Sequence, residues 1–325
     1  FNDIFEKRVL LNSNLYIDFI ENNNYLNNIS SSNPYENFFY NFTLNYQRDE
    51  LNFEYNYSYS SDFYFLTSVR EMQNIYIEKA LSNPLISMNG KSQSLKLSKV
   101  ITNKLSYNLF IERQIPYDEH KDYYNQDDSY IASTKMQYRN QNNIISGEYG
   151  FFYEPTSFLG SFSSGAFRIK EANTTFIHLK STSSSRDYRF FANYFHANTK
   201  VNISNDSIYS NFKIISSSSW SLGLEKLINN NGKEFIRFLT YQPIRVHDGS
   251  FKLNITKYAD TAGNIYSSFA NYDLEPNSRE INYEISYNKS KKNIDYKVGA
   301  LIIRNGGHIK ENNSKIILLE VKKYL

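Results

Sequence analysis

The residue types that could support catalysis are scattered along this chain and do not form a recognisable motif. Serine is abundant, but no Gly-x-Ser-x-Gly segment places a serine on the sharp turn of a hydrolase, and nothing resembles the triad motifs of subtilisin. No His-Glu-x-x-His segment or other ligand spacing indicates zinc. The sequence therefore predicts no catalytic residue, no metal site and no cofactor, and we expect that the chain is not an enzyme. The five histidines are His120, His178, His196, His247 and His308.

Charged side chains recur on the polar side of two alternating blocks, 278–289 and 293–304. Isoleucine and tyrosine alternate with asparagine, glutamate and serine in the first block, and the second block repeats the alternation. A period of two is typical of β-strands that have one apolar and one polar face. We expect the charged groups to face an aqueous lumen or its mouth, either as ion pairs or as a charged path for a polypeptide or solute. These lumen-facing candidates are Arg279, Glu284, Asp295 and Lys297.

Alternating blocks of about ten residues, the length that a tilted strand needs to cross a bilayer, continue through most of residues 35–325. Short turns such as 48–50 alternate with long connections such as 115–128 and 259–277, an asymmetry typical of outer-membrane barrels. The sequence therefore predicts an all-β fold, a transmembrane antiparallel up-and-down β-barrel with fourteen strands by count and twelve as the alternative. Residues 1–34 have a mixed pattern, and we expect a leader or lumen segment that enters the barrel.

The composition fits a membrane barrel with an aqueous lumen. The 325 residues include 29 tyrosines and one tryptophan, and tyrosine suits both strands and interfacial girdles. Mean hydropathy is −0.58, and no apolar run approaches the length of a spanning helix. The net charge of +3 is dispersed, so nothing indicates nucleic acid, and the absence of cysteine suits passage through an oxidising periplasm. A soluble β-sandwich is the alternative, but the regular strand length and the loop asymmetry favour the barrel.

Several segments of the C-terminal third resemble those of a known family. They are WSLGLEK at 220–226, YQPIRV at 241–246 with Gly249 just after it, LEPNSREI at 274–281 and IRNGGHI at 303–309. In this order and spacing they resemble the C-terminal translocator of alphaproteobacterial autotransporters whose passenger is a subtilisin-like (S8) serine peptidase. NPLISMNG at 83–90 is similar to an earlier block of that family. Two features depart from the family: its barrels usually have twelve strands and end in an aromatic residue, whereas this chain ends in Leu325.

The resemblance implies a type V secretion system in the outer membrane of a Gram-negative bacterium. In that system the barrel exports or displays an N-terminal passenger, such as a subtilisin-like peptidase, and any enzymatic activity belongs to the passenger. The implied partners are outer-membrane lipids, the barrel-assembly machinery and the upstream passenger. Because the sequence begins at Phe1 without a leader, we expect a mature product or a fragment. A stand-alone outer-membrane channel or surface protein of unknown ligand is the alternative. Structural roles are implied for Pro243, Arg245, Gly249, Arg279 and Gly307.

Overall fold

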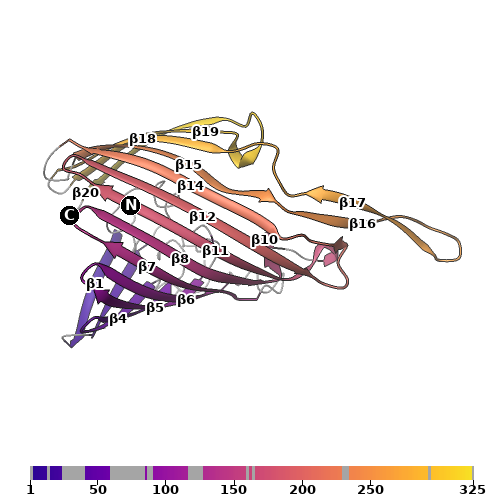
Figure 1. Ribbon diagram of the computed structural model, residues 1–325, viewed down its shortest axis with the longest axis horizontal. Coiled ribbons are helices and arrows are strands. Elements are labelled where there is room, and N and C mark those ends of the chain that lie inside the picture. Colours follow the sequence, from indigo (N-terminus) through magenta and orange to yellow (C-terminus); the bar gives the residue numbers. More distant parts are fainter. Residues whose placement is uncertain are drawn as a thin grey trace.

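The computed structural model shows one large curved antiparallel sheet and a small sheet that extends from one end of it (Figure 1). The described residues are 3–12, 15–23, 41–58, 85, 91–115, 127–158, 161–162, 165–228, 234–291 and 294–323. Among these residues the large sheet holds fifteen strands, which follow one another in chain order. Its first eight strands are β1 (Asp3–Asn12), β2 (Leu15–Asn23), β3 (Asn41–Arg48), β4 (Leu51–Ser58), β5 (Lys91–Thr102), β6 (Leu105–Ile115), β7 (Ser129–Arg139) and β8 (Asn143–Pro155). The other seven are β11 (Ile169–Ser184), β12 (Tyr188–Ile203), β14 (Ile215–Leu227), β15 (Glu234–Asp248), β18 (Ile281–Lys291), β19 (Ile294–Arg304) and β20 (Ser314–Lys323).

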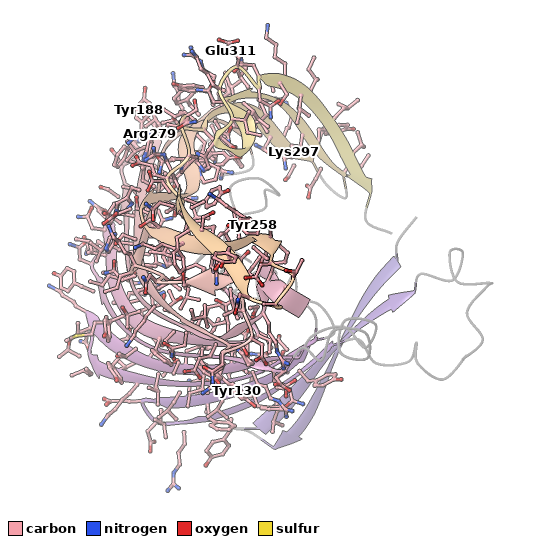
Figure 2. All side chains as sticks on the ribbon, turned by 90° about the vertical axis from the view of Figure 1, so that its right-hand side faces the viewer. Tyr130, Tyr188, Tyr258, Arg279, Lys297 and Glu311 are labelled. Carbon is pink, nitrogen blue, oxygen red and sulfur yellow. The ribbon has the colours of Figure 1, made fainter. Side chains whose placement is uncertain are left out.

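The sheet is concave on one face and convex on the other, and the alternation in the sequence assigns each side chain to one of these faces (Figure 2). In β12, Phe191, Asn193 and Phe195 are buried, whereas Phe190 and Tyr194 are exposed. The buried Lys297 lies on the concave side, which identifies that side with the buried positions (Figure 2). We call the concave side the inner face and the convex side the outer face.

The outer face carries large apolar side chains that are exposed to the surroundings. They come from strands all along the sheet, and they leave an apolar surface of the kind that lipid covers in a membrane barrel. Trp220 belongs to this face: it lies in the middle of β14, between the inward-facing Ser219 and Ser221. Further examples are Leu109, Ile111, Met136, Ile145, Tyr149, Phe151, Ile177, Leu179, Leu222, Leu224, Ile236, Phe238, Ile285, Val298 and Ile302.

The predicted all-β, antiparallel up-and-down architecture is confirmed, and the part of the chain that the structure describes contributes fifteen strands to the sheet, where the sequence predicted fourteen. Two strands are additional: Asp3–Asn12 and Leu15–Asn23 lie in the expected leader segment, where they pair with each other, and the second of them also pairs with β3. The alternation of apolar and polar residues in these two strands is weak. Their strand structure therefore depends more on hydrogen bonding to the neighbouring strands than on the sequence pattern. β1 and β20 are the two edges of the sheet. Because fifteen is odd, these two strands run in the same direction.

One predicted barrel strand lies outside the large sheet. Residues 249–258 form most of β16 (Ser250–Ala259), which pairs with β17 (Ile265–Asp273) inside the expected loop 259–277. This hairpin extends well beyond the wall and forms a small sheet with β13 (Tyr209–Ser210) (Figure 1, right). The sequence could not distinguish the two arrangements, because a hairpin in water and a strand in the wall both alternate with a period of two.

Gly249 marks the place where the chain leaves the wall between β15 and β16. Its φ of +146° favours glycine, and an added Cβ would lie 3.2 Å from the Cα of Ile215. Aromatic rings then fix the base of the hairpin: Phe251 lies 5.1 Å from both Tyr209 and Phe212, centroid to centroid, and 5.6 Å from Tyr272. The hairpin is therefore anchored to the end of the barrel by its own core.

The tip of the hairpin is closed by the carboxylate of Asp260. This carboxylate accepts hydrogen bonds from the N–H groups of Ala262 (3.0 Å) and Asn264 (2.8 Å) and from the Asn264 side chain (2.8 Å). The hydrogen bond from the Asn264 side chain, followed by those from the backbone, lowers the pKa of Asp260. The turn is therefore an ordered element outside the membrane.

The remaining described elements are short. They are β9 (Ser157–Phe158), β10 (Ser161–Phe162) and the two 3-10 turns η1 (Gly165–Phe167) and η2 (Gly306–His308). In the described part of the chain, no helix is long and apolar enough to cross a membrane.

Candidate functional site

The inner face of the wall is the candidate functional site, because charged and polar side chains are buried there behind an apolar outer face. Ionisable groups at membrane depth are costly and usually mark a pathway for ions or substrates. They are tolerated here because they face one another across neighbouring strands. Buried polar residues of this face include Asn45, Asn56, Ser94, Ser133, Thr174, His178, Asn193, Ser221, Glu225, Arg237, Asn282, Glu284, Ser286 and Lys297.

An ion pair between Glu225 and Arg237 lies at the centre of one charged group. The two side chains are each 2% exposed, and Arg237 Nε donates to Glu225 Oε2 at 2.9 Å, with Nη2 bound to the same oxygen. Arg189 Nη1 lies 3.4 Å from Glu225 Oε1. The guanidinium group of Arg237 also lies over the rings of Phe235 (4.8 Å) and Phe191 (5.7 Å). Both partners are therefore held rigidly against the wall.

Glu284 and Lys297 continue this group onto the next two strands. Both are buried, and the positive charges of Lys297 and Arg237 act on the Glu284 carboxylate. The register places Leu239 opposite Glu284, so Arg237 lies one inward position away from it on β15. From β12 to β19, the inner face thus carries a row of alternating sign: Arg189, Glu225, Arg237, Glu284 and Lys297.

A second charged group lies on β7, β8 and β11. Lys135 is opposite Glu148, and Glu148 is opposite His178, with Lys180 at the next inward position of β11. His178 Nδ1 lies 3.5 Å from Glu148 Oε2, and its Nε2 lies 2.5 Å from Asn193 Oδ1. Two lysines therefore flank a single carboxylate that is already directed to a histidine.

An apolar cluster covers the inner face on the side of the long connections. It contains Phe110, Ile131, Phe152, Phe176, Phe195 and Ala197, and Leu85 packs into it with no exposed surface. Gln114 Nε2 donates to the carbonyl oxygen of Leu85 at 3.5 Å. The Phe176 ring occupies the space beside Gly150, where an added Cβ would lie 2.3 Å from the ring. Leu85 therefore packs against the inner face beside the charged groups.

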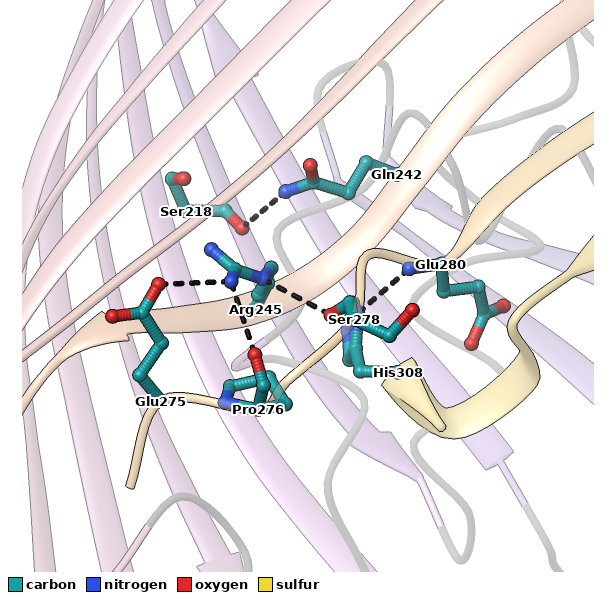
Figure 3. A network of polar contacts seen from close by, with 8 residues as sticks. All are labelled: Ser218, Gln242, Arg245, Glu275, Pro276, Ser278, Glu280 and His308. Atoms are coloured by element: carbon teal, nitrogen blue, oxygen red, sulfur yellow. Dashed lines mark hydrogen bonds and ion pairs between the residues drawn. The ribbon is translucent and has the colours of Figure 1, made fainter. Parts of the chain in front are cut away.

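At the rim, Arg245 of β15 joins the segment that precedes β18 (Figure 3). Its Nη2 donates to Glu275 Oε1 at 2.9 Å and to the Pro276 carbonyl oxygen at 3.1 Å, and its Nε donates to the Ser278 carbonyl oxygen at 3.4 Å. The rigid fork of the guanidinium group thus holds three points of one turn. Arg245 therefore orders the return of the chain from the hairpin to the wall.

His308 completes the rim network from the β19–β20 connection (Figure 3). Its Nδ1 accepts a hydrogen bond from the Glu280 N–H at 2.9 Å, which leaves Nε2 to donate to the Ile244 carbonyl oxygen at 3.0 Å. Gly307, with a φ of +67°, donates its N–H to Glu280 Oε2 at 2.6 Å. Segments from three of the blocks at 241–309 that resemble the translocator family therefore meet at one end of the wall.

The candidates predicted from the sequence divide between the wall and this rim. Glu284 and Lys297 lie together on the inner face, and Asp295 is half-buried at the same parity near the end of β19. Arg279 is exposed at the rim, where its carbonyl oxygen accepts a hydrogen bond from Asn305 Nδ2 at 3.2 Å. Of the residues implied by the resemblance, Pro243, Arg245, Gly249 and Gly307 all lie at or near the rim or the start of the hairpin.

The sequence alone did not indicate which residues interact with the predicted charged candidates on the inner face. Glu225 and Arg237 lie on either side of a short connection in the sequence and alternate in phase with the inward positions, so a count of residues from that connection would have paired them. The packing of Leu85 against the wall has no comparable signal, because it joins residues far apart in the chain. Among the described residues, no group of three or more His, Asp or Glu could hold a metal ion.

The sheet is antiparallel, and each of its strands pairs with the next sheet strand along the chain. Its outer face is apolar and its inner face is charged. These features together define the class of outer-membrane β-barrel proteins. No family model matches the sequence, and no curated protein matches it significantly.

Solved structures with a similar fold include OmpT, an outer membrane protein of Vibrio cholerae. Its in-vitro folded form has a TM-score of 0.53 and 10% identity, covering 98% of this chain and 88% of that one. The trimer form has a TM-score of 0.54 and 10% identity, with coverages of 98% and 89%. A loop L8 deletion mutant has a TM-score of 0.52 and 8% identity, with coverages of 98% and 89%. This likeness shows the fold, and the apolar outer face and polar inner face of the sheet agree with the predicted location in the bacterial outer membrane.

Proposed function

We propose that this protein is an outer-membrane channel through which small polar solutes move along the inner wall. The observation that supports the proposal is the rows of charged side chains on the inner face at membrane depth, opposite an apolar outer face. A chain gains little net stability from burying many ionic groups, because desolvation offsets most of their attraction. Such groups are instead useful where water and polar solutes must pass.

The apolar cluster around Leu85 sets the expected size limit of the channel. Aromatic and aliphatic side chains narrow a lumen without offering hydrogen bonds, so wide or strongly hydrated solutes pass slowly. Substitution of Leu85 by alanine removes part of this narrowing. Leu222, which is exposed on the outer face, provides a matched control for the same change.

Conductance of the refolded protein in planar lipid bilayers tests the channel function. We expect discrete conductance steps, a larger conductance for Leu85→Ala and an unchanged conductance for Leu222→Ala. Liposome swelling with sugars of increasing size should show the same order. A folded protein that neither conducts nor admits a small sugar contradicts the proposal.

A translocator is the second candidate, and the rim network supports it. The segments that resemble autotransporter translocators are joined there by Arg245, Glu280 and His308. In this version the barrel-assembly machinery inserts the chain, and the lumen delivers an N-terminal passenger. A folded reporter fused before Phe1 should then reach the cell surface and become sensitive to added protease. A reporter that stays protected while the barrel is correctly assembled would exclude the translocator function.

We further propose that this chain has no hydrolytic activity in either version. The buried His178 contacts Asn193 and Glu148. Neither contact is with a serine, so His178 is not paired with a nucleophile that it could activate. Treatment of the refolded chain with a serine-reactive probe should leave it unlabelled. Stoichiometric labelling that disappears with His178→Ala would show an active site in the wall.

A further inference from the structure

We infer that Lys135 and Lys180 form a binding site in the lumen for an anionic group, a carboxylate or phosphate, of a passing solute. The inference rests on the proposed channel function and gives its solute a chemical class.

The two lysines approach the same stretch of wall from either side of β8. Lys135 lies on β7 directly opposite Glu148, and Lys180 lies on β11 one inward position from His178. Neighbouring strands are about 4.8 Å apart, so β7 and β11 are about 10 Å apart. Two lysine side chains that extend from these strands can both reach a small anion placed over β8.

Neither ammonium group has a partner of its own in the described part of the chain. The adjacent lysine, Lys96, is held by Glu54 at 3.4 Å, and the Glu148 carboxylate is directed to His178. No hydrogen bond or ion pair joins Lys135 or Lys180 to a described residue, and both residues are largely buried but keep some exposed surface. Neither ammonium group is therefore occupied, and the exposed part of each residue can meet a ligand that enters the lumen.

The electrostatics favour an anion at this place. The positive charges of Lys135 and Lys180 repel each other, and Lys96 adds to the repulsion on Lys135. Glu148 attracts both lysines, but one carboxylate does not neutralise two ammonium groups. An anionic group between the lysines relieves their repulsion and neutralises the remaining positive charge, and a wall of low dielectric strengthens this attraction.

The test compares binding and conduction for the two lysines and for a lysine elsewhere. The double variant Lys135→Gln/Lys180→Gln removes the site, Glu148→Gln removes the competing carboxylate, and Lys200→Gln removes a charge from an exposed position on the outer face of β12. Binding of inorganic phosphate and of acetate is measured by calorimetry on refolded protein. In bilayers, the block of the chloride current by each anion is measured in parallel, and the mobility of unboiled protein on gels reports folding.

We expect saturable binding and block for the wild type and for Lys200→Gln. Affinity should fall about tenfold or more in the double variant and rise about tenfold in Glu148→Gln, as expected for close charges in a medium of intermediate dielectric. Equal phosphate and acetate affinity in the wild type and a folded double variant overturns the inference, even if the channel conducts. Anion binding without any conductance retains the site but refutes the channel.

Discussion

Substitution of Ile285 by arginine tests which face of the wall meets lipid. Ile285 is 54% exposed and is the fifth of the eleven residues of β18. Four residues at about 3.3 Å each place it about 13 Å along the strand, or about 10 Å along the membrane normal for a tilt of about 40°. The apolar band of such barrels is about 25 Å tall, so Ile285 lies near its middle. A charge at this depth costs about 2–4 kcal/mol.

Urea unfolding of the protein refolded into lipid vesicles measures this cost. The matched control is Ile309→Arg, the same change at a 63% exposed position of the rim. Because water already surrounds Ile309, the control should change the free energy of unfolding by about 0.5 kcal/mol or less. Equal losses at the two positions, or no loss at Ile285, would refute the assignment of the outer face to lipid.

Three further predictions follow from individual contacts. Arg237→Ala leaves the buried Glu225 carboxylate with only its longer contact to Arg189, and we expect a loss near the lower end of about 3–5 kcal/mol in urea unfolding. Gly223→Ala places a Cβ 1.8 Å from the Phe191 ring, so it should cost about 1–3 kcal/mol, and the double variant with Phe191→Leu should recover part of the loss. The lowered pKa of Asp260 means that its turn is stabilised at neutral pH and loses this stabilisation only as the pH falls through the lowered value. Proteolysis at the hairpin tip should therefore increase in strong acid, and Asp260→Ala should show the same increase already at neutral pH.

Much of the wall could be predicted from the sequence, because successive side chains of a strand point to opposite faces of the sheet. The alternation that places Glu284 and Ile285 on opposite faces of β18 is a local property of the chain. The pairing of Glu284 with Arg237 and Lys297 depends on the register of three strands, and a single sequence does not fix that register.

Other features depend on contacts that no local pattern encodes. Phe251 alternates as a wall strand would, but its ring stacks on Phe212 and Tyr272 outside the barrel, so the predicted strand became a hairpin. Leu85 occupies the lumen because the phenylalanines of distant strands leave an apolar surface for it. The sequence therefore predicts which side chains lie on each face of a strand, but not which distant residues pack against the inner face.

The position of Trp220 has a consequence for how assembly can be followed. It is the only tryptophan among the 325 residues and is the sixth of the thirteen residues of β14. Indole fluorescence shifts to the blue when the ring leaves water, and lipids brominated at chosen carbons quench it according to depth. These 325 residues thus carry one optical probe at the centre of one strand, with Tyr194 directly opposite it on β12 as an energy donor. The insertion of β14 can be timed without any label.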